Sequence, residues 1–354
     1  MIVSIIIFFI IFGVLVISHE GGHFLIAKAN GIRVNEFTIG MGPALFKTKK
    51  GDTEYSIRLL PFGGACIFDG MDGLEDDKEE ETQEYDEHSF RNAKVWSRIA
   101  TVFAGPFFNF LLAYVLSIIV TAFSTWTFPV VAGLTEDSAA AEAGLAEGDT
   151  IISINGESIS MGQEVTLISQ LNNGEDLTIV YERDGEEYTT VLTPKYDEES
   201  GRYYMGVYVG EYGNITGIDI LPYAYKNVVF YFKMTWKSLA MLVTGRFSVN
   251  DLSGPVGIVK AVDDTYEAVK PYGLPSVVLT MLDLALFLSV NLGVMNLLPI
   301  PALDGGRLIF LLIEVVRGKP VPPEKEGYVH LAGMIALMVL MVIVLFNDIG
   351  RFIR

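Results

Sequence analysis

The sequence is poor in cysteine, histidine and basic residues, and its first 17 residues carry no charged side chain. The single cysteine, Cys66, excludes an internal disulfide, and its apolar, glycine-rich surroundings favour a small packed residue over a nucleophile. Lys and Arg number 25 against 43 Asp and Glu, which gives a net charge of −18. So acidic a chain is not expected to bind nucleic acid.

The sequence is rich in long apolar segments. Hydrophobic residues make up 51% of the chain and its mean hydropathy is +0.40, which favours a polytopic membrane protein with a soluble insert. Residues 1–17 lack the basic start and the small-residue cleavage site of a signal peptide. The apolar run continues to Ala27, about 40 Å of helix, so it predicts a retained transmembrane helix.

Three further segments have membrane character, namely residues 95–123, 277–298 and 331–346. Pro106 lies inside the first of them and is expected to kink or break its helix. Nine Lys and Arg lie between the first two spans and a tenth, Arg98, lies at the start of the second, against three in the insert from 125 to 225. The positive-inside rule therefore predicts a cytoplasmic loop between these spans and an insert on the other side of the membrane.

The segments between the spans differ in pattern. Residues 37–68 alternate as strands do, whereas residues 69–87 form an acidic run that favours a solvated loop over a specific binding tail. Residues 128–210 predict a compact soluble domain containing a hairpin that turns at Asp184-Gly185. Residues 223–242 predict an amphipathic helix that lies at the membrane interface.

The strongest chemical signal is His19-Glu20-Gly21-Gly22-His23, which lies inside the first apolar segment. Ionisable side chains at membrane depth are costly and rare, so their presence favours a function. On a helix His19 and His23 lie on one face and can share one zinc ion, with Glu20 beside them as the general base. The alternative is a helix whose two imidazoles pair with neighbouring carbonyl groups.

A catalytic zinc site usually has three protein ligands, so a third one is needed. The candidate is Asp304 in residues 296–307, where Pro299 and Pro301 break the third span. Irregular backbone at membrane depth survives only when it is buried in protein or lines a cavity. This segment and the histidines lie near the cytoplasmic ends of their spans, so they can meet. The alternative is a loop just outside the bilayer with Asp304 solvated.

Several other segments carry recognisable motifs: residues 37–43, 55–64, 104–110 and 252–258, together with Ala143-Gly144-Leu145, Gly148-Asp149 and Ile154-Asn155-Gly156. With the histidine and Asp304 motifs, the chain resembles the site-2 protease family of intramembrane zinc metalloproteases over nearly its whole length. The likeness is greatest to the bacterial regulator-of-sigma-E protease type. The last three motifs resemble those of a PDZ domain.

The resemblance implies a polytopic α-helical membrane protein with about four transmembrane helices, a membrane-associated β-hairpin region on the cytoplasmic side and an extracytoplasmic α+β PDZ domain. The expected divisions are a first transmembrane helix at 1–27, the β region and acidic loop at 28–94, a second span at 95–124, the PDZ domain at 125–210, an interfacial helix and linker at 211–276, a third span with the third ligand at 277–317, and a loop and fourth span at 318–354.

The resemblance also implies roles for residues. His19, His23 and Asp304 would bind Zn²⁺, and Glu20 would activate water. Asn109, Asn296 and Pro299 would hold the substrate strand or the developing oxyanion.

The implied activity is cleavage of peptide bonds within or near the transmembrane segments of single-pass membrane proteins, such as anti-sigma factors or remnant signal peptides. The location would be the bacterial inner (cytoplasmic) membrane, with the active site near the cytoplasmic side of the lipid bilayer. The PDZ groove would bind a peptide or chain terminus, or the domain would exclude substrates by size.

Two departures from the family pattern affect these expectations. Gly21 stands where members of this type often carry a larger residue, and the insert has room for one PDZ domain where some members have two. A catalytically silent membrane adaptor that presents a PDZ domain is an alternative function. A transporter is another, since it also uses broken helices, but it leaves the histidine motif unexplained.

Overall fold

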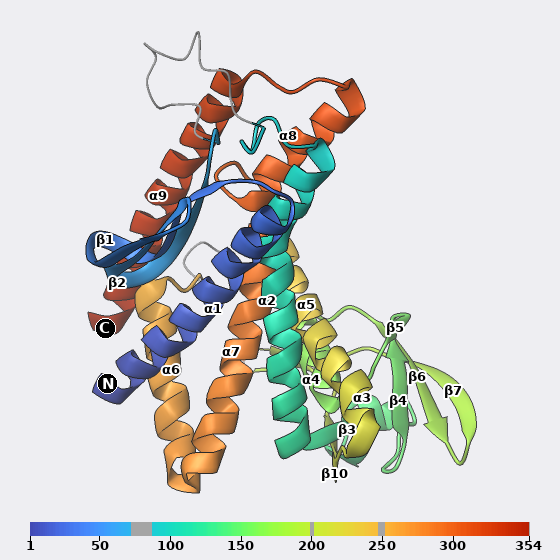
Figure 1. Ribbon diagram of the computed structural model, residues 1–354. Coiled ribbons are helices and arrows are strands. Elements are labelled where there is room, and N and C mark those ends of the chain that lie inside the picture. Colours follow the sequence, from blue (N-terminus) through green and yellow to red (C-terminus); the bar gives the residue numbers. More distant parts are fainter. Residues whose placement is uncertain (72–86, 199–201, 247–251, 354) are drawn as a thin grey trace. The chain divides into compact units, whose positions relative to one another are not determined.

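The computed structural model describes residues 1–71, 87–198, 202–246 and 252–353 (Figure 1). Most of the acidic run predicted as a solvated loop falls at 72–86, outside the described residues. The chain forms two compact units, Met1–Ser117 with Tyr231–Arg354, and Ile118–Phe230.

Four helices in the described part of the chain are long and apolar enough to cross a membrane. They are α1 (Ile2–Ala29), α2 (Val95–Phe123), α7 (Leu274–Asn296) and α9 (Pro323–Ile353). Pro106 lies inside α2 and does not end it, so the expected break is absent. Proline is tolerated inside such helices because neighbouring groups satisfy the freed carbonyl.

The helix expected at the interface is α5 (Ile220–Val243), which is not among the four candidate spans. Polar contacts join its second half to α7. The Tyr231 hydroxyl donates to Asp283 at 2.6 Å, and the Thr235 hydroxyl donates to Asn291 Oδ1 at 2.8 Å. These contacts give Asp283 and Asn291, two polar side chains of the third span, a partner at membrane depth, where an unpaired polar group is costly.

A further helix, α6 (Pro255–Val269), occupies a segment that the sequence analysis took as linker. The helix begins with Pro255 after Gly254, and the Gly257 N–H donates to Asp348 on α9 at 2.8 Å. One apolar face packs beside α1 and α7 (Figure 1), in a cluster that includes Phe8, Ile258, Val259, Val262, Tyr266, Val277 and Met281. α6 was missed because charged residues fill its other face.

The strands predicted at 37–68 are β1 (Val34–Lys50) and β2 (Thr53–Phe68). Both strands are bent, so the first part of β1 is paired twice: Phe37 lies opposite Tyr55 and also opposite Cys66. Residues 44–50 pair with 53–58. Among the described strands, residues 64–68 pair with β1 alone, so their other edge is open.

Ile118–Phe230 contains an antiparallel sheet with the strand order β10-β3-β4-β6-β7, and β5 pairs with β4. Its strands are β3 (Thr125–Leu134), β4 (Thr150–Ile154), β5 (Glu157–Ser158), β6 (Leu177–Arg183), β7 (Glu186–Leu192) and β10 (Val207–Asn214). The helices α3 (Ala139–Glu142) and α4 (Gly162–Leu171) and the small hairpin of β8 (Lys195–Asp197) and β9 (Arg202–Tyr204) complete it.

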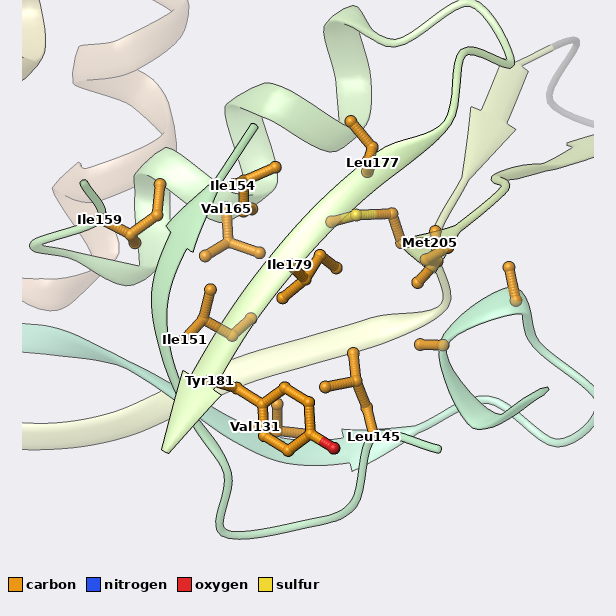
Figure 2. Packing of buried hydrophobic residues seen from close by; sticks show 13 residues of the cluster. Val131, Leu145, Ile151, Ile154, Ile159, Val165, Leu177, Ile179, Tyr181 and Met205 are labelled. Atoms are coloured by element: carbon orange, nitrogen blue, oxygen red, sulfur yellow. The ribbon is translucent and has the colours of Figure 1, made fainter. Parts of the chain in front are cut away.

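The core of this unit is one hydrophobic cluster (Figure 2). Figure 2 shows side chains from β3, β4, β6 and α4 meeting there, among them Val131, Ile151, Val165 and Ile179. The predicted turn joins β6 to β7, with positive φ at Asp184 (54°) and Gly185 (82°). Such a turn matches the twist of an antiparallel hairpin and fixes its register.

Candidate metal centre

The two motif histidines meet near the C-terminal end of α1. Their positions, four residues apart, place both on one helix face, and their Nε2 atoms lie 3.3 Å apart. The side chains are largely buried, with 12% of His19 and 9% of His23 exposed. Two imidazole nitrogens therefore converge at one point on a largely apolar helix.

The broken end of the third span brings Asp304 to this point. α7 ends at Asn296, and α8 (Asp304–Arg317) begins with Asp304 itself. Gly305 and Gly306 follow, and a Cβ on either would overlap a backbone carbonyl of the loop before them. Glycine therefore allows the loop to fold tightly enough to direct the Asp304 carboxylate inward.

The three donor atoms form a nearly equilateral triangle. Asp304 Oδ2 lies 3.2 Å from His19 Nε2 and 3.4 Å from His23 Nε2. Tetrahedral zinc with ligands at about 2.0–2.1 Å requires its ligand atoms to be roughly 3.3 Å apart. Asp304 Oδ2 is buried and makes no aligned hydrogen bond within the described part of the chain. The donor set therefore fits a zinc ion, which would satisfy this carboxylate oxygen.

Backbone and side-chain groups on α2 hold the outer nitrogens of the two rings. His23 Nδ1 lies 2.9 Å from the Thr101 carbonyl, so Nδ1–H donates to it and Nε2 keeps its lone pair for a metal. The Asn109 amide lies 3.1 Å from His19 Nδ1. With the amide nitrogen toward the ring, Asn109 Oδ1 is buried without a hydrogen bond. With the oxygen toward the ring, His19 Nδ1–H has an acceptor and Nε2 is again free for the metal.

Asn109 is fully buried, and the Ser289 hydroxyl of α7 donates to its backbone carbonyl at 2.7 Å. This placement favours orientation of His19 over contact with a substrate. Asn296, the last residue of α7, is half-buried, and Pro299 is exposed in the loop that follows. The described contacts link neither Asn296 nor Pro299 to the three donors, so their substrate roles stay predictions.

Glu20 lies where α1 meets the open edge of β2. Its carboxylate receives a backbone hydrogen bond from Cys66. A Cβ on Gly64 would lie 2.8 Å from Glu20 Cγ and 2.8 Å from the Thr38 carbonyl, so the strand can approach the helix this closely only at a glycine. Burial, and then the charge of Glu20, raises the pKa of the Cys66 thiol. A protonated thiol agrees with a packed residue rather than a nucleophile.

The two glycines of the motif have different surroundings. A Cβ on Gly22 would lie 2.5 Å from the Ala104 carbonyl and 2.9 Å from Phe108 Cβ. A Cβ on Gly21 would meet nothing within 4 Å. Gly22 therefore allows α1 and α2 to cross closely. A methyl group in place of the Gly21 hydrogen would not crowd the metal centre.

Three groups at or beside this centre carried no recognised signal in the sequence: the Thr101 carbonyl, Gly105 and His330. Gly105 faces the donors so closely that a Cβ there would overlap His23 Nε2. His330, on α9, accepts a hydrogen bond from the Ala302 N–H in the loop before Asp304. An imidazole directly before an apolar segment was a signal that could have identified His330.

Comparisons with known proteins identify the family. The sequence model of Peptidase family M50 matches residues 7–340. Zinc metalloprotease RasP of Bacillus licheniformis is 35% identical over 428 aligned positions, covering 98% of this chain and 99% of that protein. Regulator of sigma-W protease RasP of Bacillus subtilis is 33% identical over 423 positions, covering 98% of each chain. Both alignments exceed the 354 residues here, so both relatives contain residues with no counterpart in this chain.

Among solved structures, the PDZ domain of an SdrC-like protein from Listeria monocytogenes is 22% identical, with a TM-score of 0.22. The match covers 24% of this chain and 90% of that domain.

Proposed function

Because this chain belongs to peptidase family M50, we propose that it cleaves peptide bonds within or near the transmembrane segments of single-pass membrane proteins. Its family and the names of its relatives make it a zinc metalloprotease. Anti-sigma factors and remnant signal peptides are the substrate classes that we infer. The cell membrane of a bacterium is the proposed location.

One observation carries this proposal: the donors of His19, His23 and Asp304 lie within 4.8 Å of one another on and beside a helix long enough to span a bilayer. Ionisable groups at that depth are expected to serve a function. A carboxylate and two imidazoles leave one position of a tetrahedral site open, as catalytic zinc requires.

The chain's own residues would do most of the work at this site. Bound zinc would lower the pKa of water and polarise the scissile carbonyl. Glu20 would take the proton from the attacking water and deliver it to the leaving amine. The Thr101 carbonyl and Asn109 would keep the two imidazoles in the tautomer that presents Nε2.

The open edge of β2 would present the substrate to Glu20. A transmembrane helix hides its peptide bonds, so it must unwind locally before attack. Residues 64–68 could then pair with the unwound segment by strand addition and replace its lost hydrogen bonds. The hydrogen bond from Cys66 places this edge beside the Glu20 carboxylate.

The unit Ile118–Phe230 would act as an extracytoplasmic PDZ domain. Its sequence motifs support this, and β10 is an edge strand of its sheet, open to an added peptide strand. The scarcity of Lys and Arg in the insert supports the outer location, with the metal centre near the cytoplasmic side.

The PDZ domain would either bind a peptide terminus or exclude substrates with large outer domains. Deletion of residues 135–194 distinguishes these roles. If the domain is a size filter, the deletion variant should cut untrimmed substrate. If it binds a peptide, the deletion variant should cut both untrimmed and trimmed substrate more weakly than the wild type does.

Membrane proteomics would test the proposed activity. Cells expressing the wild type and cells expressing Glu20→Gln are compared, and a single-pass protein should accumulate uncut in the variant. The adaptor alternative predicts identical membrane proteomes. A purified wild type that cleaves the accumulated protein, and a Glu20→Gln variant that does not, would complete the test.

A further inference from the structure

We propose that His330 of α9 is a positioning residue that holds the turn carrying Asp304 into the metal centre; this inference rests on the proposed role of Asp304 as a ligand. This turn consists of residues 297–303, which join α7 to α8. Four observations support it, from the backbone of the turn, from the His330 ring, from Gly333 and from the exposure of α9.

The turn contains an unfavourable backbone conformation two residues before Asp304. Ala302 has φ = 77°. The other described non-glycine residues with positive φ are Asp137, Asn155 and Asp184. Asp and Asn visit the left-handed region comparatively easily, whereas alanine does so at a cost. Ala302 therefore needs surrounding structure to keep it there.

His330 supplies a direct restraint on this residue. Its Nδ1 accepts a hydrogen bond from the Ala302 N–H at 2.9 Å. An accepting Nδ1 means that the ring is neutral, with its proton on Nε2. The ring also packs against Phe310 of α8, with 5.6 Å between ring centroids. His330 therefore contacts the turn and the helix that Asp304 begins.

Gly333, one helical turn along α9, contacts the residue before Ala302. A Cβ there would lie 2.5 Å from both the Cβ and the carbonyl oxygen of Pro301. On the other side of the turn, Gly306 packs on the Ile300 carbonyl. The turn is thus enclosed between α8 and α9, so its conformation depends on both helices.

The rest of α9 makes few contacts. It is the least buried of the four candidate spans, and most of its large apolar side chains are exposed, as expected for a lipid-facing helix. Its restraint on the turn is therefore local to His330 and Gly333. If that restraint is lost, Ala302 can relax to negative φ and move Asp304 away from His19 and His23.

The test measures zinc affinity of the full-length protein in detergent, by competition with a chromophoric chelator. His330→Leu removes the acceptor and should raise the zinc dissociation constant by about tenfold, the lower end of effects seen for groups behind a ligand. His330→Asn places an amide oxygen near the position of Nδ1 and should stay within about twofold of the wild type. Tyr328→Leu, at an exposed position on the same helix, is the matched control.

A rescue variant separates positioning from mere packing. Glycine occupies positive φ without strain, so Ala302→Gly should restore most of the affinity lost in His330→Leu. Failure of this rescue would show that His330 acts through packing alone and would overturn the inference. Wild-type affinity in His330→Leu would overturn it too, leaving the proposed function intact. A wild-type protein that binds no zinc would overturn both.

Discussion

At the scale of single residues, each of the two histidines has one ring nitrogen directed at the site and the other held by the protein. The Thr101 carbonyl holds His23 and the Asn109 amide holds His19. Such outer contacts fix the tautomer and orientation of an imidazole before a metal arrives.

Substitutions of Asn109 would test this role. Asn109→Leu should weaken zinc binding by about 10- to 100-fold, because His19 loses its acceptor. Asn109→Asp keeps an oxygen for Nδ1–H and should retain most of the affinity. The measurement is a chelator competition on purified protein. Equal zinc affinity in Asn109→Leu and the wild type would contradict the orienting role. It would favour contact of Asn109 with the substrate instead.

Gly21 and Gly22 provide a matched pair of substitutions. Gly22→Ala forces a methyl group against the Ala104 carbonyl and should destabilise the protein by about 1–3 kcal/mol, as overpacking does. Gly21→Ala meets no atom within 4 Å and should be neutral or stabilising by up to about 1 kcal/mol. Thermal unfolding in detergent compares the two. Equal loss in both variants would mean that α1 and α2 do not cross at Gly22.

At the scale of elements, the hairpin of β1 and β2 depends on a polar cluster around Glu36. The Glu36 carboxylate accepts from Thr38 at 2.5 Å and from Arg58 at 2.7 Å. The Thr38 hydroxyl, and then the Arg58 guanidinium, hold the pKa of Glu36 below its ordinary value. The ionised carboxylate therefore stabilises the folded hairpin.

The stabilisation of the hairpin by Glu36 depends on pH. Because the folded pKa is lowered, this stabilisation is present above the ordinary carboxyl pKa and is lost as the pH falls through the folded value. Glu36→Gln should therefore unfold at a lower temperature than the wild type at pH 7, and the difference should shrink in acid. Thermal melts from pH 7 to about pH 3 measure this. A constant difference across that range would contradict the ionic contribution.

The elements differ in how far the sequence could predict them. The spans were predictable because bilayer thickness requires a long apolar run. α6 was not, because Lys260, Asp263 and Glu267 interrupt its apolar pattern and only its packing on α1 and α7 explains it. Of the two effects expected of Pro106, a kink or a break, the break is absent, and the local rule that predicted it ignores the neighbours that satisfy a freed carbonyl.

The candidate site was also predictable from the sequence only in part. Helix periodicity alone places His19 and His23 on one face. The approach of Asp304 depends on the left-handed turn at Ala302, on its contact with His330 and on close packing at Gly105. Those features join segments far apart in the sequence, so no local pattern predicted them.

At the scale of the whole molecule, the centre is assembled from four helices that are distant in sequence. α1 supplies two donors and Glu20, α2 holds their outer nitrogens, α8 begins with the third donor, and α9 contacts the turn before it. The residues that these four helices contribute to the centre all lie within the unit Met1–Ser117 and Tyr231–Arg354. The second unit contributes no donor to the His19, His23 and Asp304 cluster.

The most direct test of the account is the zinc content of the purified full-length protein and of three single variants, His19→Ala, His23→Ala and Asp304→Asn, determined by elemental analysis after exchange into zinc-free buffer. The account predicts one zinc per chain in the wild type and loss of zinc in each variant, because each removes one of three ligands. One zinc per chain in Asp304→Asn, retained as firmly as in the wild type, would contradict it.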